Sequence, residues 1–178
     1  MSEKSPLEIE RKWMVKGWPE TDLPLLTEQK MNQGYVTVRP TVRIREENTI
    51  VSNDPKHPVR DTYVLCFKSK GLLTRKEIEI EIEKEKYEQL EDLIGLPLIQ
   101  KTRRTYSLNN GLKLEVNQVD PGQPTAFWYA EIEFHSEEEA NAYNPHTDHL
   151  EDFLNDDVTG QPGQSMGAYW EATRHTSD

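Results

Sequence analysis

The stretch Arg75-Lys-Glu-Ile-Glu-Ile-Glu-Ile-Glu83 decides how the fold of this chain is read. Its odd positions hold one arginine and four glutamates, and its even positions include Ile78, Ile80 and Ile82. Strict alternation of this kind is typical of a β-strand, because successive side chains point to opposite faces of a sheet. The stretch therefore predicts a strand with one charged face and one apolar face.

Similar alternation dominates the first three quarters of the chain. The predicted strands are bounded by turn-forming Gly, Pro, Asn and Asp residues. They cover residues 7–13, 33–38, 41–46, 62–68, 75–83, 98–108, 112–117 and 126–134. Eight antiparallel strands can close into a barrel whose interior holds side chains or one small ligand.

Helical spacing is confined to short segments. Residues 84–94 repeat apolar side chains on one helical face, and Gly95 is suited to end that helix. Ser136 and the glutamates after it resemble a capped helix start. We also expect helices over 147–154 and 168–174, with a glycine-rich loop between them.

No repeat or domain boundary is visible, so we expect a single domain over residues 1–178. Its class is α+β, mainly β: an eight-stranded antiparallel barrel with flanking helices.

Composition excludes several classes of protein. The chain has 178 residues, of which 30% are charged and only 34% hydrophobic; 21 basic against 32 acidic residues give a net charge of −11. This charge argues against general binding to nucleic acids or to anionic membranes. The single cysteine excludes an intrachain disulfide and fits a reducing compartment.

The start Met1–Pro6 lacks the apolar core of a secretory signal, and no apolar run approaches membrane-spanning length. We expect a cytoplasmic protein; the oligomeric state, including a homodimer, stays open.

The charged faces of the strands allow two arrangements. Their carboxylates are Glu8, Glu10, Glu77, Glu79, Glu81, Glu115, Glu131 and Glu133. Their cations are Lys12, Arg43, Arg45, Lys68, Arg75, Lys101 and Arg103. If these faces point outward, they form a solvated surface of weak cross-strand ion pairs. If they point inward, they line a polar tunnel, and the low hydrophobic content is explained.

A tunnel with both signs of charge has a definite chemistry. Clustered glutamates bind hard divalent cations such as Mg²⁺ or Mn²⁺. Arginine and lysine bind several phosphate groups at once. Together they neutralise a polyphosphate and stabilise the transition state of phosphoryl transfer. Because unpaired buried carboxylates are unfavourable, the metal and the bases must contribute to stability.

An ordered set of motifs resembles one known family. The set comprises ExExK (Glu8, Glu10, Lys12), QGY (33–35), RxR (Arg43, Arg45), Lys68, RxExE (Arg75, Glu77, Glu79), KxR (Lys101, Arg103), Glu115 and AEIE (130–133). In this order they resemble the CYTH domain, or triphosphate tunnel metalloenzyme, family over about residues 7–160. The likeness is to its short, single-domain bacterial branch, and it implies an eight-stranded tunnel.

The resemblance also implies roles for these residues. Glu8, Glu10 and one or both of Glu131 and Glu133 would hold the metal. The groups that grip phosphate oxygens would be Lys12, Arg43, Arg45, Lys68, Arg75, Lys101 and Arg103. Lys12 would alternatively assist proton transfer. Glu77, Glu79 and Glu115 would hold a second metal or orient the attacking water.

The function that follows is metal-dependent hydrolysis of inorganic triphosphate to pyrophosphate and phosphate. One alternative is class IV adenylate cyclase, which the same family includes. Another is a polyphosphate- or nucleotide-binding module without turnover, which Asn117 favours because the family usually carries a metal-site aspartate there. The physiological substrate, whether inorganic triphosphate, ATP or thiamine triphosphate, stays open. The glycine-rich segment after Thr159 also departs from the family, so the lid over one tunnel mouth is expected to differ.

Two further signals are read as structural. His146 and His149, with Asp148 between them, have a spacing seen in metal sites but are interpreted as a helix start. Cys66 lies in an apolar strand and is interpreted as a buried or tunnel-wall residue rather than a nucleophile.

Overall fold

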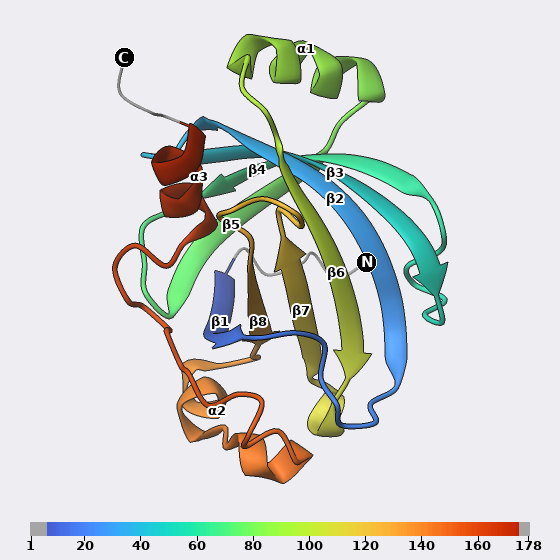
Figure 1. The fold of residues 1–178 in the computed structure, drawn as a ribbon, viewed down its shortest axis with the longest axis vertical. Helices are drawn as coiled ribbons and strands as arrows, with labels where there is room; N and C mark the ends of the chain where they lie inside the picture. The colour runs from blue at the N-terminus through green and yellow to red at the C-terminus, as the bar shows by residue number, and fades with distance from the viewer. Residues whose placement is uncertain (1–6, 175–178) are drawn as a thin grey trace.

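The computed structural model describes residues 7–174, so the Met1–Pro6 stretch lies outside the described residues. Eight antiparallel strands close into a barrel in the order β1-β5-β4-β3-β2-β6-β7-β8 (Figure 1). The strands are β1 (Leu7–Val15), β2 (Leu25–Thr37), β3 (Thr41–Ser52), β4 (Asp61–Lys68), β5 (Thr74–Glu81), β6 (Ile99–Ser107), β7 (Lys113–Val119) and β8 (Phe127–Glu133). The predicted barrel is confirmed.

Two strands are longer than their apolar patterns indicate. β2 begins at Leu25, eight residues before the predicted start at residue 33, and β3 continues to Ser52 rather than ending at residue 46. The additional part of β2 is mostly polar, so it lacks the alternation of apolar residues from which a strand is predicted. Backbone pairing with β3 on one side and β6 on the other holds it in the barrel.

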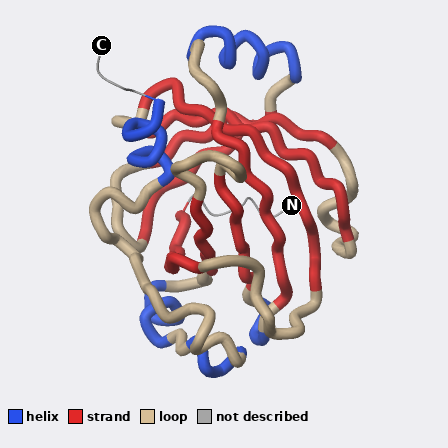
Figure 2. Tube along the Cα trace, in the orientation of Figure 1, coloured by secondary structure: helices blue, strands red, loops and turns tan. Residues whose placement is uncertain are grey.

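The helices lie at the periphery of the barrel (Figure 2). α1 (Lys84–Ile94) has the predicted bounds and contacts β2, β3 and β4. α2 (Glu137–Ala142) is capped by the Ser136 side chain, which accepts from the Glu139 amide. α3 (Met166–Arg174) begins two residues earlier than predicted. None of the described helices is long and apolar enough to cross a membrane.

The helix predicted over 147–154 is wrong. A short 3-10 helix, Pro145–Asp148, occupies its start, and turns follow. His149 adopts a left-handed backbone conformation, with φ of 58°, directly after this turn. A residue in that conformation ends the helical hydrogen-bond pattern.

The orientation of the pleats places the charges inside. Ile78 and Ile80 are 56% and 48% exposed on the outer face, whereas Glu77 and Glu79 line the internal cavity. The apolar core instead packs outside the barrel wall. One cluster contains Trp13, Leu114 and Ile132, and a second surrounds Trp170 of α3. The inward arrangement of the charged faces is therefore confirmed, except for Glu81 at the end of β5, whose side chain is 64% exposed and lies beside Arg60.

Residues 156–158, here called the strap, pair with β1 beyond the point where its pairing with β5 ends. β1 pairs with β5 only through Leu7–Ile9 and then with β8 from Glu10 onward. Further along β1, the Met14 amide donates to the Asp156 carbonyl and the Val158 amide donates to the Lys12 carbonyl, both at 2.9 Å. This contact carries the glycine-rich loop, residues 160–165, to a mouth of the cavity.

The position of the core gives a stability prediction. Ile132→Ala should lower the free energy of unfolding by about 2–5 kcal/mol, because Ile132 is fully buried between the barrel and the helices. Ile78→Ala should change it by less than about 1 kcal/mol, because Ile78 is more than half exposed. Urea unfolding of the two variants measures both values; equal losses would contradict this location of the core.

Candidate active site

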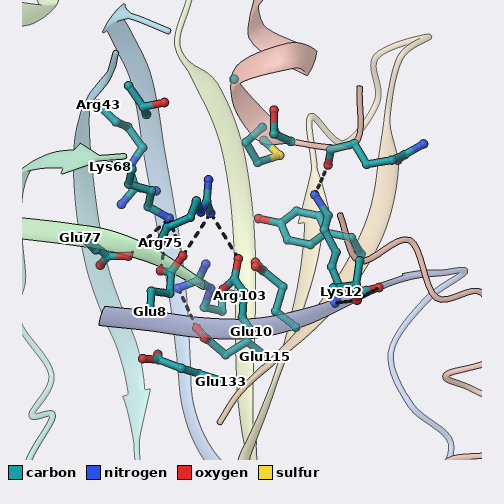
Figure 3. A pocket seen from close by; sticks show the side chains of 18 of the residues that line it. Glu8, Glu10, Lys12, Arg43, Lys68, Arg75, Glu77, Arg103, Glu115 and Glu133 are labelled. Atoms are coloured by element: carbon teal, nitrogen blue, oxygen red, sulfur yellow. Dashed lines mark hydrogen bonds and ion pairs between the residues drawn. The ribbon is translucent and has the colours of Figure 1, made fainter. Parts of the chain in front are cut away.

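A cavity of about 950 Å³ runs through the barrel. Every site residue predicted from the sequence lines it. These residues are Glu8, Glu10, Lys12, Arg43, Arg45, Lys68, Arg75, Glu77, Glu79, Lys101, Arg103, Glu115, Glu131 and Glu133. Figure 3 shows many of them converging from several strands on one space. The fold thus brings the predicted residues together, while their individual roles stay predictions.

Glu8 is the centre of an ion-pair network on one side of the cavity. One of its oxygens lies 3.3 Å from Lys68 Nζ and the other 3.1 Å from an Arg75 nitrogen. The same arginine lies 3.4 Å from Glu10, and Lys68 lies 3.4 Å from Glu77 (Figure 3). Two cations therefore hold three carboxylates, which leaves this side of the cavity with an excess of negative charge.

That excess forces carboxyl groups to share hydrogen bonds. Glu10 lies close to Glu131 and Glu8 close to Glu77, and a proton shared within each pair would relieve the repulsion. Burial, followed by the charge of Glu131, raises the pKa of Glu10 well above its usual value. Burial would also raise the pKa of Glu131, but the hydrogen bond with Glu10 and the charge of Lys12 lower it to about 2.

This donor set has the chemistry that a divalent metal ion prefers, but among the described residues no three of these four glutamates bring ligand atoms within 4.8 Å of one another. Glu8, Glu10, Glu131 and Glu133 all present oxygen ligands to the same cavity, and Glu133 lies beside Glu10 in the strand register. Hard divalent cations prefer oxygen ligands, and a cation relieves the same repulsion that a shared proton relieves. The predicted metal ligands are therefore compatible with the group that the family resemblance implies.

Arginines dominate a second part of the cavity wall. Arg45 Nε donates to Glu47 at 2.7 Å, and nitrogens of Arg43 and Arg45 lie 3.8 and 3.7 Å from Glu79. Both arginines are 7% exposed. Glu79, predicted to act in catalysis, is thus held between two guanidinium groups.

Arg103 is fixed by two residues of β7. It lies 2.7 Å from Glu115, and its Nε donates to the Asn117 Oδ1 at 2.8 Å. Asn117 is fully buried and is not among the residues that line the cavity. The position where the family usually has a metal-site aspartate serves here to orient an arginine.

Lys12 and Lys101 have partners of a different kind. Lys12 Nζ donates to the backbone carbonyl of Gln164 in the glycine-rich loop and lies over the ring of Tyr129. Lys101 Nζ donates to the hydroxyl of Tyr129 at 3.0 Å. Burial lowers the pKa of both lysines, and the charge of Arg103 lowers that of Lys101 further.

Three residues with polar side chains on the cavity wall, Glu47, Tyr35 and Tyr129, are among those to which sequence reasoning gave no role. Glu47 continues the inward parity of Arg43 and Arg45, so a longer prediction for that strand would have found it. Tyr35 belongs to the QGY motif but had no assigned role. Tyr129 precedes Glu131 by two positions and shares its face, yet an aromatic residue on a charged face gave no chemical signal.

Two other groups with metal-binding atoms are not assigned a metal. Ligand atoms of Cys66, Glu77 and Glu79 lie within 4.8 Å of one another. The thiol of Cys66 suits softer metals, so this group does not fit the hard divalent cation that the family resemblance implies. His146 pairs with Glu151, and the buried Asp148 accepts from the Tyr143 hydroxyl at 2.8 Å. The histidine spacing was interpreted as the start of a helix; the structure places it in a short 3-10 helix that ends at Asp148.

Comparison with known proteins points in one direction. No family model matches the chain. An inorganic triphosphatase from Nitrosomonas europaea is 32% identical over 142 residues, which cover 78% of this chain and 83% of that protein. The crystal structure of the inorganic triphosphatase NE1496 is similar with a TM-score of 0.56 and 24% identity, covering 91% of this chain and 93% of the other.

A second solved structure shares the fold at lower identity. HpAC1 from Hippeastrum, described as an adenylyl cyclase candidate with a dominant triphosphatase activity, has a TM-score of 0.56 and 16% identity, covering 93% of this chain and 95% of that chain. At this identity the likeness concerns the fold alone.

The coupled carboxyl groups give a prediction about stability and metal. Folding raises the pKa of Glu10 above its ordinary value of 4.5. The protonated carboxyl group therefore stabilises the folded protein fully when the pH is below 4.5. This stabilisation is lost as the pH rises through the raised pKa of the folded state. Glu10→Gln should therefore raise the melting temperature of the metal-free protein at neutral pH but leave it nearly unchanged near pH 4. It should also remove the stabilisation that Mg²⁺ or Mn²⁺ gives the unmodified protein.

Thermal melting in EDTA and with each metal tests this prediction. The exposed Glu20→Gln is the matched control and should behave as the unmodified protein does. If metal stabilises Glu10→Gln as strongly as the unmodified protein, Glu10 is not a ligand.

Proposed function

The chain belongs to the inorganic triphosphatase family of triphosphate tunnel proteins, and from this premise we propose that it hydrolyses inorganic triphosphate to pyrophosphate and phosphate. One water molecule is consumed, and its oxygen becomes part of the released phosphate. The observation that carries the proposal is the convergence of arginines, lysines and glutamates on one enclosed cavity. Such a cavity binds a highly charged anion although the protein is itself acidic. The electrostatic potential inside the cavity, rather than the net charge of the whole protein, determines anion binding.

We propose Mg²⁺ or Mn²⁺ as the cofactor, held by Glu8, Glu10, Glu131 and Glu133. When bound, such an ion neutralises phosphate oxygens and supports phosphoryl transfer as a Lewis acid. The shared hydrogen bonds between carboxyl groups support this assignment, because they mark where the chain has too few positive charges. Lys68 and Arg75, two of the predicted phosphate-binding side chains, lie directly beside Glu8.

Substrate binding in this proposal exchanges one set of ion pairs for another. Arg43, Arg45 and Arg103 are nearly buried and line the cavity, and side-chain hydrogen bonds orient the guanidinium groups of Arg45 and Arg103. A phosphate that binds them weakens their pairs with Glu79 and Glu115. We propose that these two carboxylates then orient the attacking water and accept its proton.

The alternative functions have less support. Cyclase chemistry needs a site for the base of a nucleotide. The exposed imidazoles on the cavity wall, His57 and His135, pair with Asp54 and Glu139, and Tyr35, Tyr129 and Phe134 are at most 5% exposed. The faces of these last three rings are therefore packed and cannot stack on a base. A binding module without turnover was favoured by Asn117, but that residue holds Arg103 and all four predicted metal glutamates are present.

Further parts of the proposal concern the setting of the enzyme. We propose that residues 1–178 act as one tunnel domain in the cytoplasm, without a nucleic-acid or membrane partner. A homodimer is compatible with the exposed apolar side chains Phe67, Ile78 and Ile80 on the outer face of β4 and β5.

The direct test is an assay with tripolyphosphate and either Mg²⁺ or Mn²⁺. Equal amounts of phosphate and pyrophosphate should appear, and Glu10→Gln should lower the rate at least about 100-fold because a metal ligand is lost. ATP should give no cyclic AMP. Cyclic AMP would support the cyclase, whereas tripolyphosphate binding without products would support the binding module. The exposed Glu20→Gln is again the control.

A further inference from the structure

One tyrosine contacts both lysines of the cavity that lack a carboxylate partner. Tyr129 lies on the inner face of β8 and is 1% exposed. Its hydroxyl accepts a hydrogen bond of 3.0 Å from Lys101 of β6, and its ring lies 4.3 Å from the ammonium nitrogen of Lys12 of β1. The sequence analysis assigned the two lysines to the substrate but gave Tyr129 no role.

These lysines differ from the other cations of the tunnel. Each of the others is in an ion pair with at least one glutamate: Arg43, Arg45, Lys68, Arg75 and Arg103. Within residues 7–174, the partners of Lys12 and Lys101 are a carbonyl, a hydroxyl and an aromatic ring. Glu131 acts on both lysines through its charge, but in the part of the chain that the structure describes neither lysine forms an ion pair with it, so a phosphate oxygen can approach the two amino groups without breaking an ion pair.

A neutral partner has a further effect on a buried lysine. It fixes the position of the side chain while leaving its charge available. The electron-rich face of an aromatic ring attracts an ammonium group, and a phenol oxygen accepts a hydrogen bond from one. Because the Tyr129 hydroxyl accepts from Lys101, its own hydrogen remains available to donate to an anion in the cavity.

We propose that Tyr129 is a positioning residue for the substrate: its hydroxyl orients Lys101 and its ring orients Lys12, so that both face the same triphosphate. The inference rests on the proposed function, and it adds a specific source of affinity to it. The buried carboxylates contribute to metal binding, whereas this tyrosine holds two lysine side chains at fixed positions without an ion pair.

Two substitutions separate the two contacts. Tyr129→Phe removes only the hydroxyl, whose partner is Lys101, and keeps the ring beneath Lys12. It should raise KM for tripolyphosphate about five- to tenfold, with a smaller change in kcat, since one oriented hydrogen-bond donor is lost. Tyr129→Leu also removes the ring and should raise KM further.

A double-mutant cycle distinguishes positioning from packing. In a Lys101→Met background, Tyr129→Phe should have almost no additional effect, because its partner is already gone. The additional effect of Tyr129→Leu should likewise disappear in a Lys12→Met, Lys101→Met background. If the increases in KM instead multiply when the substitutions are combined, the side chains act independently and the proposal is overturned. Tyr63→Phe is the matched control, since the Tyr63 ring packs against Tyr87 of α1 outside the barrel.

Calorimetric binding of tripolyphosphate without metal separates this inference from the proposed function. If the unmodified protein binds but does not hydrolyse tripolyphosphate, the proposed function fails, and a five- to tenfold weaker Kd of Tyr129→Phe still supports positioning. If the unmodified protein is active and Tyr129→Phe binds and reacts as it does, this inference alone fails. If the unmodified protein neither binds nor reacts, both fail. Melting temperatures confirm that each variant is folded.

Discussion

The pairing of buried charges is the constraint on which this molecule depends. An unpaired carboxylate or guanidinium inside a protein is strongly unfavourable, so a barrel filled with such groups is stable only if each finds a partner. Arg45 with Glu47, and Arg103 with Glu115, meet this condition inside the tunnel itself. Around Glu10 the acids outnumber the bases, and a shared hydrogen bond replaces the missing cation. The imbalance is local, and it lies where the predicted metal ligands are.

A charged interior also determines where the apolar core must be. Because the inside of the barrel contributes no hydrophobic burial, the outer wall has to pack against helices and loops. Ile132 and Leu114 face outward into such a cluster, and Trp170 fixes α3 against the wall. The strap at residues 156–158 also covers the barrel wall, since it pairs with the part of β1 that does not pair with β5. The C-terminal part of the chain is thus needed both for stability and for shaping one tunnel mouth.

The limits of prediction from sequence follow from the same physics. Alternation of charged and apolar residues was sufficient for the strand at 75–83 and for the inward direction of Glu77 and Glu79. It failed for the first half of β2, because a strand whose two faces are both polar has no apolar period to detect. The false helix at 147–154 arose because a left-handed residue at His149, which is not glycine, leaves little trace in the sequence. Tyr129 was missed because its importance comes from two lysines on other strands, which only the fold brings to it.

The chain has two ways of holding a cation, and they have different consequences for binding an anion. A guanidinium group paired with glutamate is rigid, but an incoming phosphate must displace or share its partner, so only the difference between the two interactions contributes to affinity. A lysine held by a carbonyl, a hydroxyl or a ring has no ion pair to break when an anion binds, and the bound anion favours its charged form against the burial that lowers its pKa. An acidic protein that binds a polyanion therefore gains more from a few cations with neutral partners than from a larger number of ion pairs. Lys12 and Lys101, around the single ring of Tyr129, are the cations of this tunnel that meet that requirement.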